Sequence, residues 1–339
     1  MGKVLSFGEL LLRISPDVDG TWLHENKLPF YIGGAECNVA TALALWGIPT
    51  AYLTALPRNF LSDQVVRYLQ EKKINTDKII YSGERIGLYY LHQGKDLKNA
   101  GVIYDRQHSA FAGLKPGTIN WEAIFADVSW FHFSAICPAI NQQVADVCLE
   151  ALQVAAAKNI FISLDLNYRA KLWQYGKEPV SIMPDLTQYC NLIMGNIWAA
   201  DKMLGIPLDE YLIANRDKES LLQQASVTSA AIQQQFPRCE MVANTFRFDQ
   251  GKGIHYYSTL YQHGELICSR EYEAETIVDK IGSGDCFMAG LIYGFNRKLS
   301  PATTLEFATA AAFQKLFIQS DATTSTVTDV QNTLSTYAH

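Results

Sequence analysis

Short apolar segments alternate with helical segments along most of this 339-residue chain, and this alternation restricts the folds that it can form. The apolar segments have the length of strands, and the segments between them have the apolar spacing of helices. Such an order is typical of a mostly parallel sheet covered by helices on both faces. We therefore expect an α/β fold that forms a single domain over residues 1–339.

The order of the expected elements also indicates where a ligand would bind. Strands are expected at 4–11, 51–56, 129–134, 160–164, 191–195 and 241–245. Helices are expected at 36–46, 62–72, 142–157, 218–235, 285–297 and 302–318. Ligands of such sheets bind beyond the carboxyl ends of the strands, so polar residues that follow a strand are the first candidates for a site.

Two segments, 14–32 and 86–106, interrupt the alternation. Both are rich in aromatic and turn residues, and neither keeps a helical period. Within the second segment, 88–92 and 102–106 are expected to be strands joined by a polar turn at 94–101. We expect these segments to form a small separate sheet over the main one.

Composition limits the class of protein. Hydrophobic residues make up 48% and charged residues 18% of the chain, as is ordinary for a globular protein. No apolar run approaches the roughly 20 residues of a membrane helix, and the first 16 residues lack the pattern of a signal peptide. The seven cysteines are scattered, which favours free thiols in a reducing cytosol. We therefore expect a cytoplasmic protein with no membrane partner.

Charge and metal motifs exclude further classes. The formal net charge is −6, and the basic residues are dispersed rather than gathered in a stripe, so a nucleic-acid partner is not expected. The sequence has no HExxH motif and no cluster of Cys and His, so a protein-held zinc ion is not expected. Ligands for any other metal are not indicated by the sequence.

The segment 279–290 carries the clearest indication of chemistry. Gly282, Ser283 and Gly284 precede an expected helix, and Asp285 lies in its first turn. Backbone N–H groups at a helix N-terminus can bind a phosphate, and a carboxylate beside them can take a proton from a hydroxyl. The pattern predicts transfer of a phosphoryl group to an alcohol. Taken alone, Asp285 could equally be a residue that caps the helix.

Two better-known phosphate motifs fit this segment poorly. A dinucleotide-binding loop needs GxGxxG after an early strand, whereas this motif lies late in the chain and has Phe287 at the place of the third glycine. A P-loop needs GxxxxGK[ST], which does not occur. Functions based on NAD or on a P-loop are therefore disfavoured.

A second glycine pair, Gly33 and Gly34, opens the helix expected at 36–46. These glycines can bring the backbone close to a ligand, and Asn38 lies in the first turns of the same helix. Gly47 is suited to end the helix. By itself this strand–turn–helix pattern is common in α/β proteins.

Together, GGAECNVATALALWG near the start and DKIGSGDCFMAG near the end resemble the two signatures of the pfkB, or ribokinase-like, carbohydrate kinases. The resemblance covers essentially the whole chain and implies a three-layer α/β/α fold with the small sheet as a lid. It implies that Asp285 is the catalytic base and that the backbone of Gly282, Ser283 and Gly284 forms an anion hole. It also implies ATP and Mg²⁺, and it leaves open a monovalent cation such as K⁺.

The nucleotide side of the resemblance has one departure. The family often carries NxxE after a central strand, linked to Mg²⁺ and phosphate, whereas this chain has Asn196 followed by Ala199 in place of the glutamate. Thr245 and Arg247 lie at and just after the end of the strand expected at 241–245, so they are candidates for nucleotide contacts. An ordinary strand-to-loop transition would place them there as well.

Two arginines indicate an acidic substrate. Arg106 ends a strand of the small sheet, and Arg169 follows the strand expected at 160–164. A guanidinium can bind a carboxylate through two parallel hydrogen bonds. Either arginine could instead be solvated or form a structural ion pair with Asp105 or Asp165.

The phrases GLYYLHQG, VIYDRQHSA and SLDLNYRAKLW resemble the branch of the family that phosphorylates 2-keto-3-deoxygluconate. This implies ATP-dependent phosphorylation of 2-dehydro-3-deoxy-D-gluconate at its 6-hydroxyl. The residues expected around this sugar acid are Gly34, Asn38, Tyr89, Tyr104, Arg106, Ile136, Arg169 and Asp285. Ile136 could also be a core residue.

Two alternatives and one assembly remain open. The chain could be a kinase for a neutral sugar, of the fructokinase or ribokinase type. It could also be a family member that binds sugar and nucleotide without turnover, which the loss of the glutamate at Ala199 would favour. Exposed strands of the lid could pair two copies of the chain into a homo-oligomer, since open sheet edges accept partners.

Overall fold

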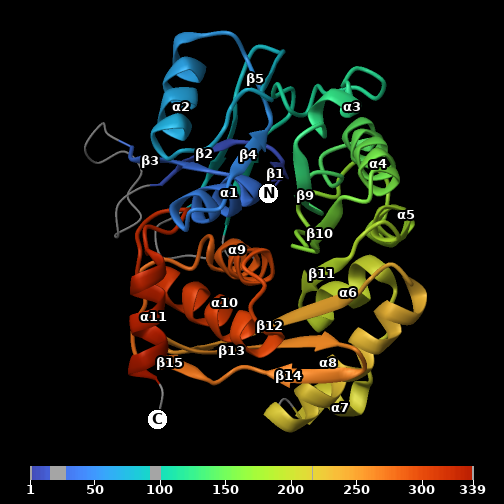
Figure 1. Cartoon of the computed structure of the whole chain (residues 1–339), viewed down its shortest axis with the longest axis vertical. Helices are drawn as coiled ribbons and strands as arrows, with labels where there is room; N and C mark the ends of the chain where they lie inside the picture. The colour runs from blue at the N-terminus through green and yellow to red at the C-terminus, as the bar shows by residue number, and fades with distance from the viewer. Residues whose placement is uncertain (1, 16–27, 92–100, 216, 338–339) are drawn as a thin grey trace.

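The computed structural model describes residues 2–15, 28–91, 101–215 and 217–337. Within these ranges, the main sheet consists of β1 (Lys3–Phe7), β4 (Thr50–Leu53), β9 (Val128–Ser134), β10 (Phe161–Asp165), β11 (Leu192–Gly195), β12 (Met241–Gln250), β13 (Gly253–Gln262), β14 (Glu265–Cys268) and β15 (Tyr272–Ala274). Its order is β14-β13-β12-β11-β10-β9-β1-β4, with β15 paired to β13 (Figure 1). The strands from β12 to β4 are parallel, which confirms the expected sheet.

Helices cover both faces of this sheet (Figure 1). One layer consists of α1 (Ala35–Leu45), α9 (Ser283–Asn296), α10 (Pro301–Lys315) and α11 (Val327–Thr336). The other consists of α3 (Trp121–Ile124), α4 (Gln142–Ala157), α5 (Met183–Thr187), α6 (Ile197–Leu204) and α8 (Lys218–Gln235), with the 3-10 helix Pro179–Ser181 and α7 (Glu210–Asn215) beside them. In the described part of the chain, no helix is both long enough and apolar enough to span a membrane.

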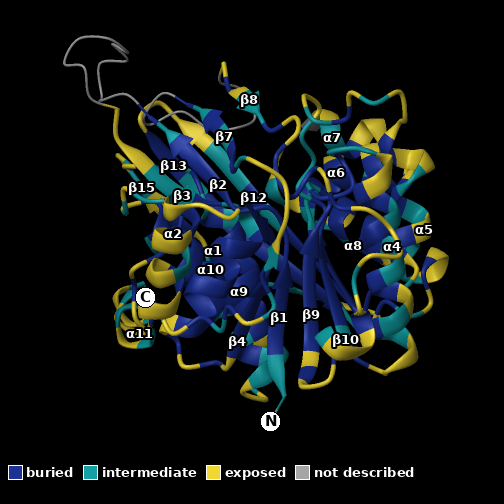
Figure 2. Cartoon of the chain, turned by 90° about the horizontal axis from the view of Figure 1, so that it is seen from above, coloured by how far each residue is buried: buried dark blue, intermediate teal, exposed yellow. Residues whose placement is uncertain are grey.

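The parallel strands are apolar on both faces because each face is covered. In β1, Val4 packs with α1 and α9 in one core, whereas Leu5 and Phe7 pack with α4 in the other. Figure 2 shows these strands as the buried centre of the molecule, with exposed residues on the outer faces of the helices. A third cluster joins α1 to α2 (Phe60–Glu71) through contacts of Val65 and Leu69.

A small sheet stands apart from the main one, as predicted. It consists of β2 (Leu11–Ile14), β3 (Phe30–Gly33), β7 (Gly87–Tyr90) and β8 (Ile103–Asp105), in the order β3-β2-β7-β8. It lies beyond the carboxyl ends of the parallel strands, where β1 leads into β2 (Figure 2). The polar turn predicted at 94–101 lies outside the described residues except for Gly101. Of the segment 14–32, residues 16–27 also lie outside them.

Three strand predictions were wrong in their bounds. The strand expected at 4–11 is interrupted at residues 8–10, because Leu11 already pairs with the small sheet as the start of β2. The strand expected at 51–56 is divided at Thr54, whose hydroxyl accepts a hydrogen bond from the Leu10 amide (3.2 Å); its second part, β5 (Ala55–Leu56), pairs with β6 (Ile80–Tyr81). β12 continues past Thr245 because it pairs with β13 over its full length.

Candidate active site

A cavity of about 580 Å³ opens beyond the carboxyl ends of β10 and β11, between the small sheet and the N-terminus of α9. The structure brings every residue predicted for the site to the wall of this cavity, although the predicted residues come from distant parts of the sequence. These residues are Gly34, Asn38, Tyr89, Tyr104, Arg106, Ile136, Arg169, Asn196, Thr245, Arg247, Gly282, Ser283, Gly284 and Asp285. Their placement is a feature of the fold, and their chemical roles stay predictions.

The N-terminus of α9 presents backbone rather than side chains to the cavity. Gly282 is the residue before the helix, with φ of 75°, and no side chain caps the first turn. The Ser283 hydroxyl is turned away, since it donates to the Ala312 carbonyl oxygen (3.2 Å). The first N–H groups of a helix have no partner within the helix, so they remain available to an anion here.

Gly282 cannot carry a side chain without moving the loop. A Cβ at this position would lie 1.8 Å from the carbonyl oxygen of Asp321. On the other side of the loop, the Ile281 amide donates to Asp279 Oδ1 (3.0 Å). The loop that leads into α9 is therefore tightly packed against the Asp321 backbone.

Asp285 is held by α1 rather than used as a helix cap. Asn38 Nδ2 donates to Asp285 Oδ2 (2.7 Å), and the carboxyl is 8% exposed. Burial raises the pKa of Asp285 to about 7, against the effect of the Asn38 hydrogen bond; Asp165 adds to the rise and Arg169 opposes it. A carboxyl with a pKa near neutrality is suited to accept a proton from a hydroxyl.

The two predicted arginines lie in different environments. Arg106 forms a structural ion pair, as one alternative predicted, but its partner is the buried Glu9; the predicted partner Asp105 instead pairs with Arg85 (2.8 Å). Arg169 Nη1 donates to the Tyr168 carbonyl oxygen (3.2 Å). Its Nε is buried and has no hydrogen-bond partner among the described residues. Such an unsatisfied charged donor is suited to bind an acidic ligand.

The small sheet forms one wall of the cavity. Tyr89 on β7 and Tyr104 on β8 are directly opposite each other, and their rings are 6.4 Å apart. The Tyr89 hydroxyl donates to Asp321 Oδ2 (2.6 Å), which links this wall to the loop packed on Gly282. Ile136 is half-buried and lines the cavity just after β9, so it is not solely a core residue.

Of the residues predicted to contact the nucleotide, Asn196 also has a structural role. Asn196 Oδ1 accepts a hydrogen bond from the Ala199 amide (2.8 Å) and caps α6, which accounts for the asparagine without a ligand. Thr245 and Arg247 lie within β12 rather than at its end. Arg247 Nη1 donates to the Lys280 carbonyl oxygen (3.4 Å), which places it beside the loop before α9.

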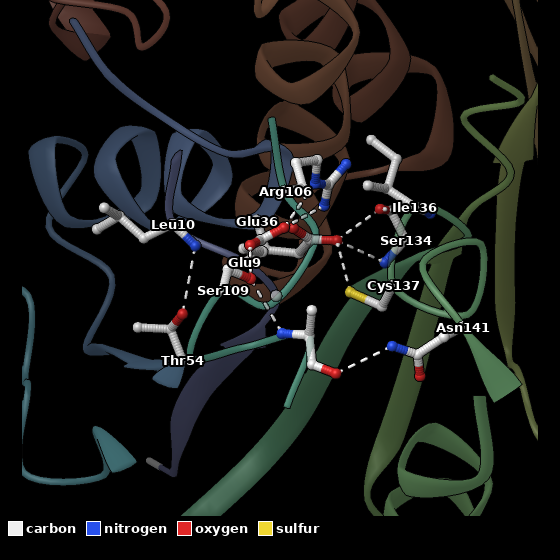
Figure 3. Close-up of polar contacts among 12 residues, drawn as sticks. Glu9, Leu10, Glu36, Thr54, Arg106, Ser109, Ser134, Ile136, Cys137 and Asn141 are labelled. Atoms are coloured by element: carbon white, nitrogen blue, oxygen red, sulfur yellow. Dashed lines mark hydrogen bonds and ion pairs between the residues drawn. The ribbon is translucent and has the colours of Figure 1, made fainter. Parts of the chain in front are cut away.

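Sequence reasoning missed three carboxylates of the cavity. Glu36 is buried, burial raises its pKa to about 7, and it accepts a hydrogen bond from the Ser134 amide (3.0 Å; Figure 3). Glu9 could have been found, because it lies two residues after the end of β1, but the prediction placed it inside the strand expected at 4–11. Asp321 has no sequence signal, since only tertiary packing brings its loop to the site.

Comparison with known proteins was consistent with this geometry. The family model "pfkB family carbohydrate kinase" matches residues 1–328. A curated relative, 2-dehydro-3-deoxygalactonokinase of Haloferax volcanii, is 27% identical over 98% of this chain and 96% of its own length. The structure of 2-dehydro-3-deoxygluconokinase from Thermotoga maritima is 31% identical over 99% of this chain and 100% of its own, with a TM-score of 0.89.

A more distant structure shows the fold alone. Fructokinase of Xylella fastidiosa with bound ATP is 19% identical and has a TM-score of 0.74, with 99% of each chain covered. The match of the family model over nearly the whole chain, together with the shared fold, decides the family. This chain belongs to the pfkB family of carbohydrate kinases and has its ribokinase-like α/β fold.

Proposed function

We propose that this protein is an ATP-dependent kinase that phosphorylates 2-dehydro-3-deoxy-D-gluconate at its 6-hydroxyl. The observation that carries the proposal is the presence of Arg106 and Arg169 in the same cavity as Asp285. A neutral sugar offers no charge to a guanidinium, whereas a sugar acid offers a carboxylate. The two similar proteins named for kinases of keto-deoxy sugar acids support the same class of acceptor.

In this proposal Asp285 takes the proton of the 6-hydroxyl as its oxygen attacks the γ-phosphorus of ATP. One P–O bond forms, the bond to ADP breaks, and the proton stays on the Asp285 carboxyl. Asn38 orients that carboxyl through its hydrogen bond (2.7 Å). The N–H groups at the start of α9 stabilise the charge on the transferred group. The tyrosines of the small sheet reduce access of water, which would otherwise accept the phosphoryl group.

Magnesium is implied by this reaction, and the donor set fits an ion carried by the nucleotide. The carboxylates that line the cavity are Glu9, Glu36, Asp165, Asp285 and Asp321. Glu9, Glu36 and Asp321 already accept hydrogen bonds from protein groups, and the described residues contain no cluster of three metal-binding side chains. Mg²⁺ bound mainly by phosphate oxygens and water fits this site, and it would neutralise part of the phosphate charge.

A panel of acceptors tests the proposal. ADP formation would be measured by a coupled assay with 2-dehydro-3-deoxy-D-gluconate, its galactose-series epimer, fructose and ribose. We expect the highest kcat/KM for the gluco acid. A clear preference for fructose or ribose would refute the acidic acceptor. A preference for the epimer would keep the sugar-acid class and change the acceptor. Phosphorylation of any of them would exclude a non-catalytic binding protein.

A further inference from the structure

The partner of Arg106 in the cavity is a second buried side chain, Glu9, that no sequence motif singled out. Arg106 Nε donates to Glu9 Oε2 at 2.6 Å, and Arg106 Nη2 lies 2.6 Å from the same oxygen (Figure 3). The Arg106 side chain is 6% exposed and that of Glu9 is 2% exposed. Both residues line the cavity. The ion pair is therefore part of the wall that a ligand would touch.

The Glu9 carboxylate has little freedom of its own. Its Oε1 accepts a hydrogen bond from the Ser109 hydroxyl, and the Ser109 hydroxyl in turn accepts one from the Ala112 amide (3.1 Å; Figure 3). A Cβ at Gly87 would lie 2.5 Å from Glu9 Oε1, so the β7 backbone packs directly against the carboxylate. The direction of the Arg106 guanidinium is thus set by a carboxylate that is itself fixed from two sides.

The pair also joins the two sheets. Glu9 lies between the end of β1 in the main sheet and the start of β2, whereas Arg106 directly follows β8 at the edge of the small sheet. β8 is only three residues long and, among the described strands, pairs with β7 alone. The ion pair therefore holds the end of a short edge strand against the mouth of the cavity.

Arg106 still has donors to offer. Nη2 is buried, and despite its contact with Glu9 it has no well-aligned hydrogen bond among the described residues. An arginine side chain loses rotamer freedom when it is ordered, so a ligand that had to order it would bind more weakly. A guanidinium ordered before the ligand arrives avoids this cost.

We propose that Glu9 is a positioning residue, which holds the Arg106 guanidinium in the orientation that binds the acceptor sugar. This inference rests on the proposed function, because it assigns the acceptor side of the cavity to Arg106. Arg106 then contributes directed hydrogen bonds to the acceptor, and Arg169 contributes further attraction for an acidic group.

The test compares two variants in which a carboxylate is replaced by the corresponding amide. One is at Glu9, and the other is at Asp105, the residue directly before Arg106. Glu9→Gln keeps the size of the side chain and removes its charge from Arg106. Asp105→Asn removes the partner of Arg85, an exposed pair next to Arg106 in sequence, and is the matched control. We expect Glu9→Gln to raise the KM for the acceptor by about 10-fold or more, from the weakening of a charge-assisted hydrogen bond, with the KM for ATP changed less than about 2-fold. Asp105→Asn should leave both unchanged.

A second, milder variant keeps the test informative if Glu9→Gln does not fold. Ser109→Ala removes one hydroxyl from the Glu9 carboxylate, and it should raise the acceptor KM in the same direction by a smaller factor. If Glu9→Gln and Ser109→Ala had the same acceptor KM as wild type and unchanged melting temperatures, the inference would be overturned. So would a parallel rise in the KM for ATP, which would show a general structural role.

These assays can distinguish failure of the positioning role of Glu9 from failure of the proposed function. The acceptor used in these assays is whichever sugar the wild-type protein phosphorylates best in the panel. If that sugar is neutral, the proposed function fails, but a selective rise of its KM in Glu9→Gln would still support Glu9 as a positioning residue. If it is the acid and its KM does not change, the positioning role fails and the proposed function stands.

Discussion

Asp285 combines a raised pKa with a fixed direction, and both come from its neighbours. Burial stabilises the protonated form, and Asn38 on α1 holds one carboxylate oxygen. A carboxylate in such surroundings gains proton affinity and keeps its orientation. Asn38 and Asp285, which are 247 positions apart in the chain, thus form one hydrogen-bonded pair.

Replacing Asp285 by asparagine tests its role. We expect Asp285→Asn to lower kcat by roughly 10²–10⁴-fold, the usual contribution of a general base. The control is Asp329→Asn, since Asp329 lies in the first turn of α11, is partly buried and forms a capping box with Thr326. That variant should keep full activity and lose a little stability. Turnover like that of wild type in Asp285→Asn would remove Asp285 from the mechanism.

The pKa of Asp285 also predicts a pH dependence. A general base must be deprotonated to accept a proton. We therefore expect kcat/KM to fall as pH is lowered through about 7, the pKa of Asp285 in the protein without ligands. Stability should follow the opposite direction. The folded state binds this proton more tightly than the unfolded state, whose pKa is about 4, so stability from this group is lost as pH rises from about 4 to 7.

Thermal melting of wild type and Asp285→Asn across this range checks the sign. The variant lacks the buried charge, so its stability relative to wild type should increase from pH 4 to pH 7 and stay constant above it. A difference that does not change with pH would show that Asp285 has an ordinary pKa in the folded protein.

Arg169 is the residue most directly tied to an acidic acceptor. Arg169→Ala should raise the KM for the sugar acid by about 10-fold to 100-fold, as expected for loss of a hydrogen bond between charged groups, and change the KM for ATP far less. Arg67→Ala on α2, an exposed position remote from the cavity, serves as the control. An unchanged KM for the acid would place the carboxylate elsewhere.

At the scale of elements, the N-terminus of α9 depends on one backbone conformation. Gly282→Ala would put a residue with a side chain at φ of 75° and a Cβ 1.8 Å from the Asp321 carbonyl oxygen. The loop must move, so its N–H groups leave their positions. We expect kcat to fall by about 10²-fold or more, as for loss of a transition-state donor.

The matched control for this loop is Gly264→Ala in the turn between β13 and β14. Gly264 also has a positive φ, of 82°, but a Cβ there meets no atom within 4 Å. It should carry the backbone cost of about 1 kcal/mol without any loss of kcat. Equal activities for the two variants would show that the packing around Gly282 is not needed for turnover.

At the scale of the whole molecule, one buried network ties the small sheet to the main domain. Arg13 on β2 pairs with Asp279 (2.9 Å) and Asp321 (2.7 Å), and all three side chains are 1% exposed. Asp321 also accepts the hydrogen bond from Tyr89 on β7. The wall of the cavity and the loop before α9 are therefore held by the same charges.

Removing Arg13 should destabilise the protein strongly. Arg13→Met leaves two buried carboxylates without their cation, and we expect a loss of about 3–5 kcal/mol of unfolding free energy, measured by urea denaturation. Arg85→Met breaks an ion pair that is more than one third exposed, and should cost about 1 kcal/mol or less. A similar small loss in both variants would contradict a structural role for the buried network.

Much of the fold and of the cavity wall was predictable, for identifiable reasons. α4 and α8 have the predicted bounds, because an Asn or Asp caps the start of each helix. The cavity residues predicted from the two glycine motifs were recognisable because glycines and helix starts leave local patterns. The pairing of β12 with β13 was missed, since strand pairing depends on neighbours that a local pattern does not name.

The sequence by itself determined the α/β class, the family and many, but not all, of the residues that surround the cavity. Those properties follow from periodicity and from motifs that need only a few adjacent positions. Only the tertiary structure decided which buried polar and charged side chains meet: Glu9 with Arg106, Asn38 with Asp285, and Arg13 with Asp279 and Asp321. The physical reason is that burial makes an unpaired charge costly, so each buried charge takes the partner that the fold places nearest, wherever that partner lies in the chain.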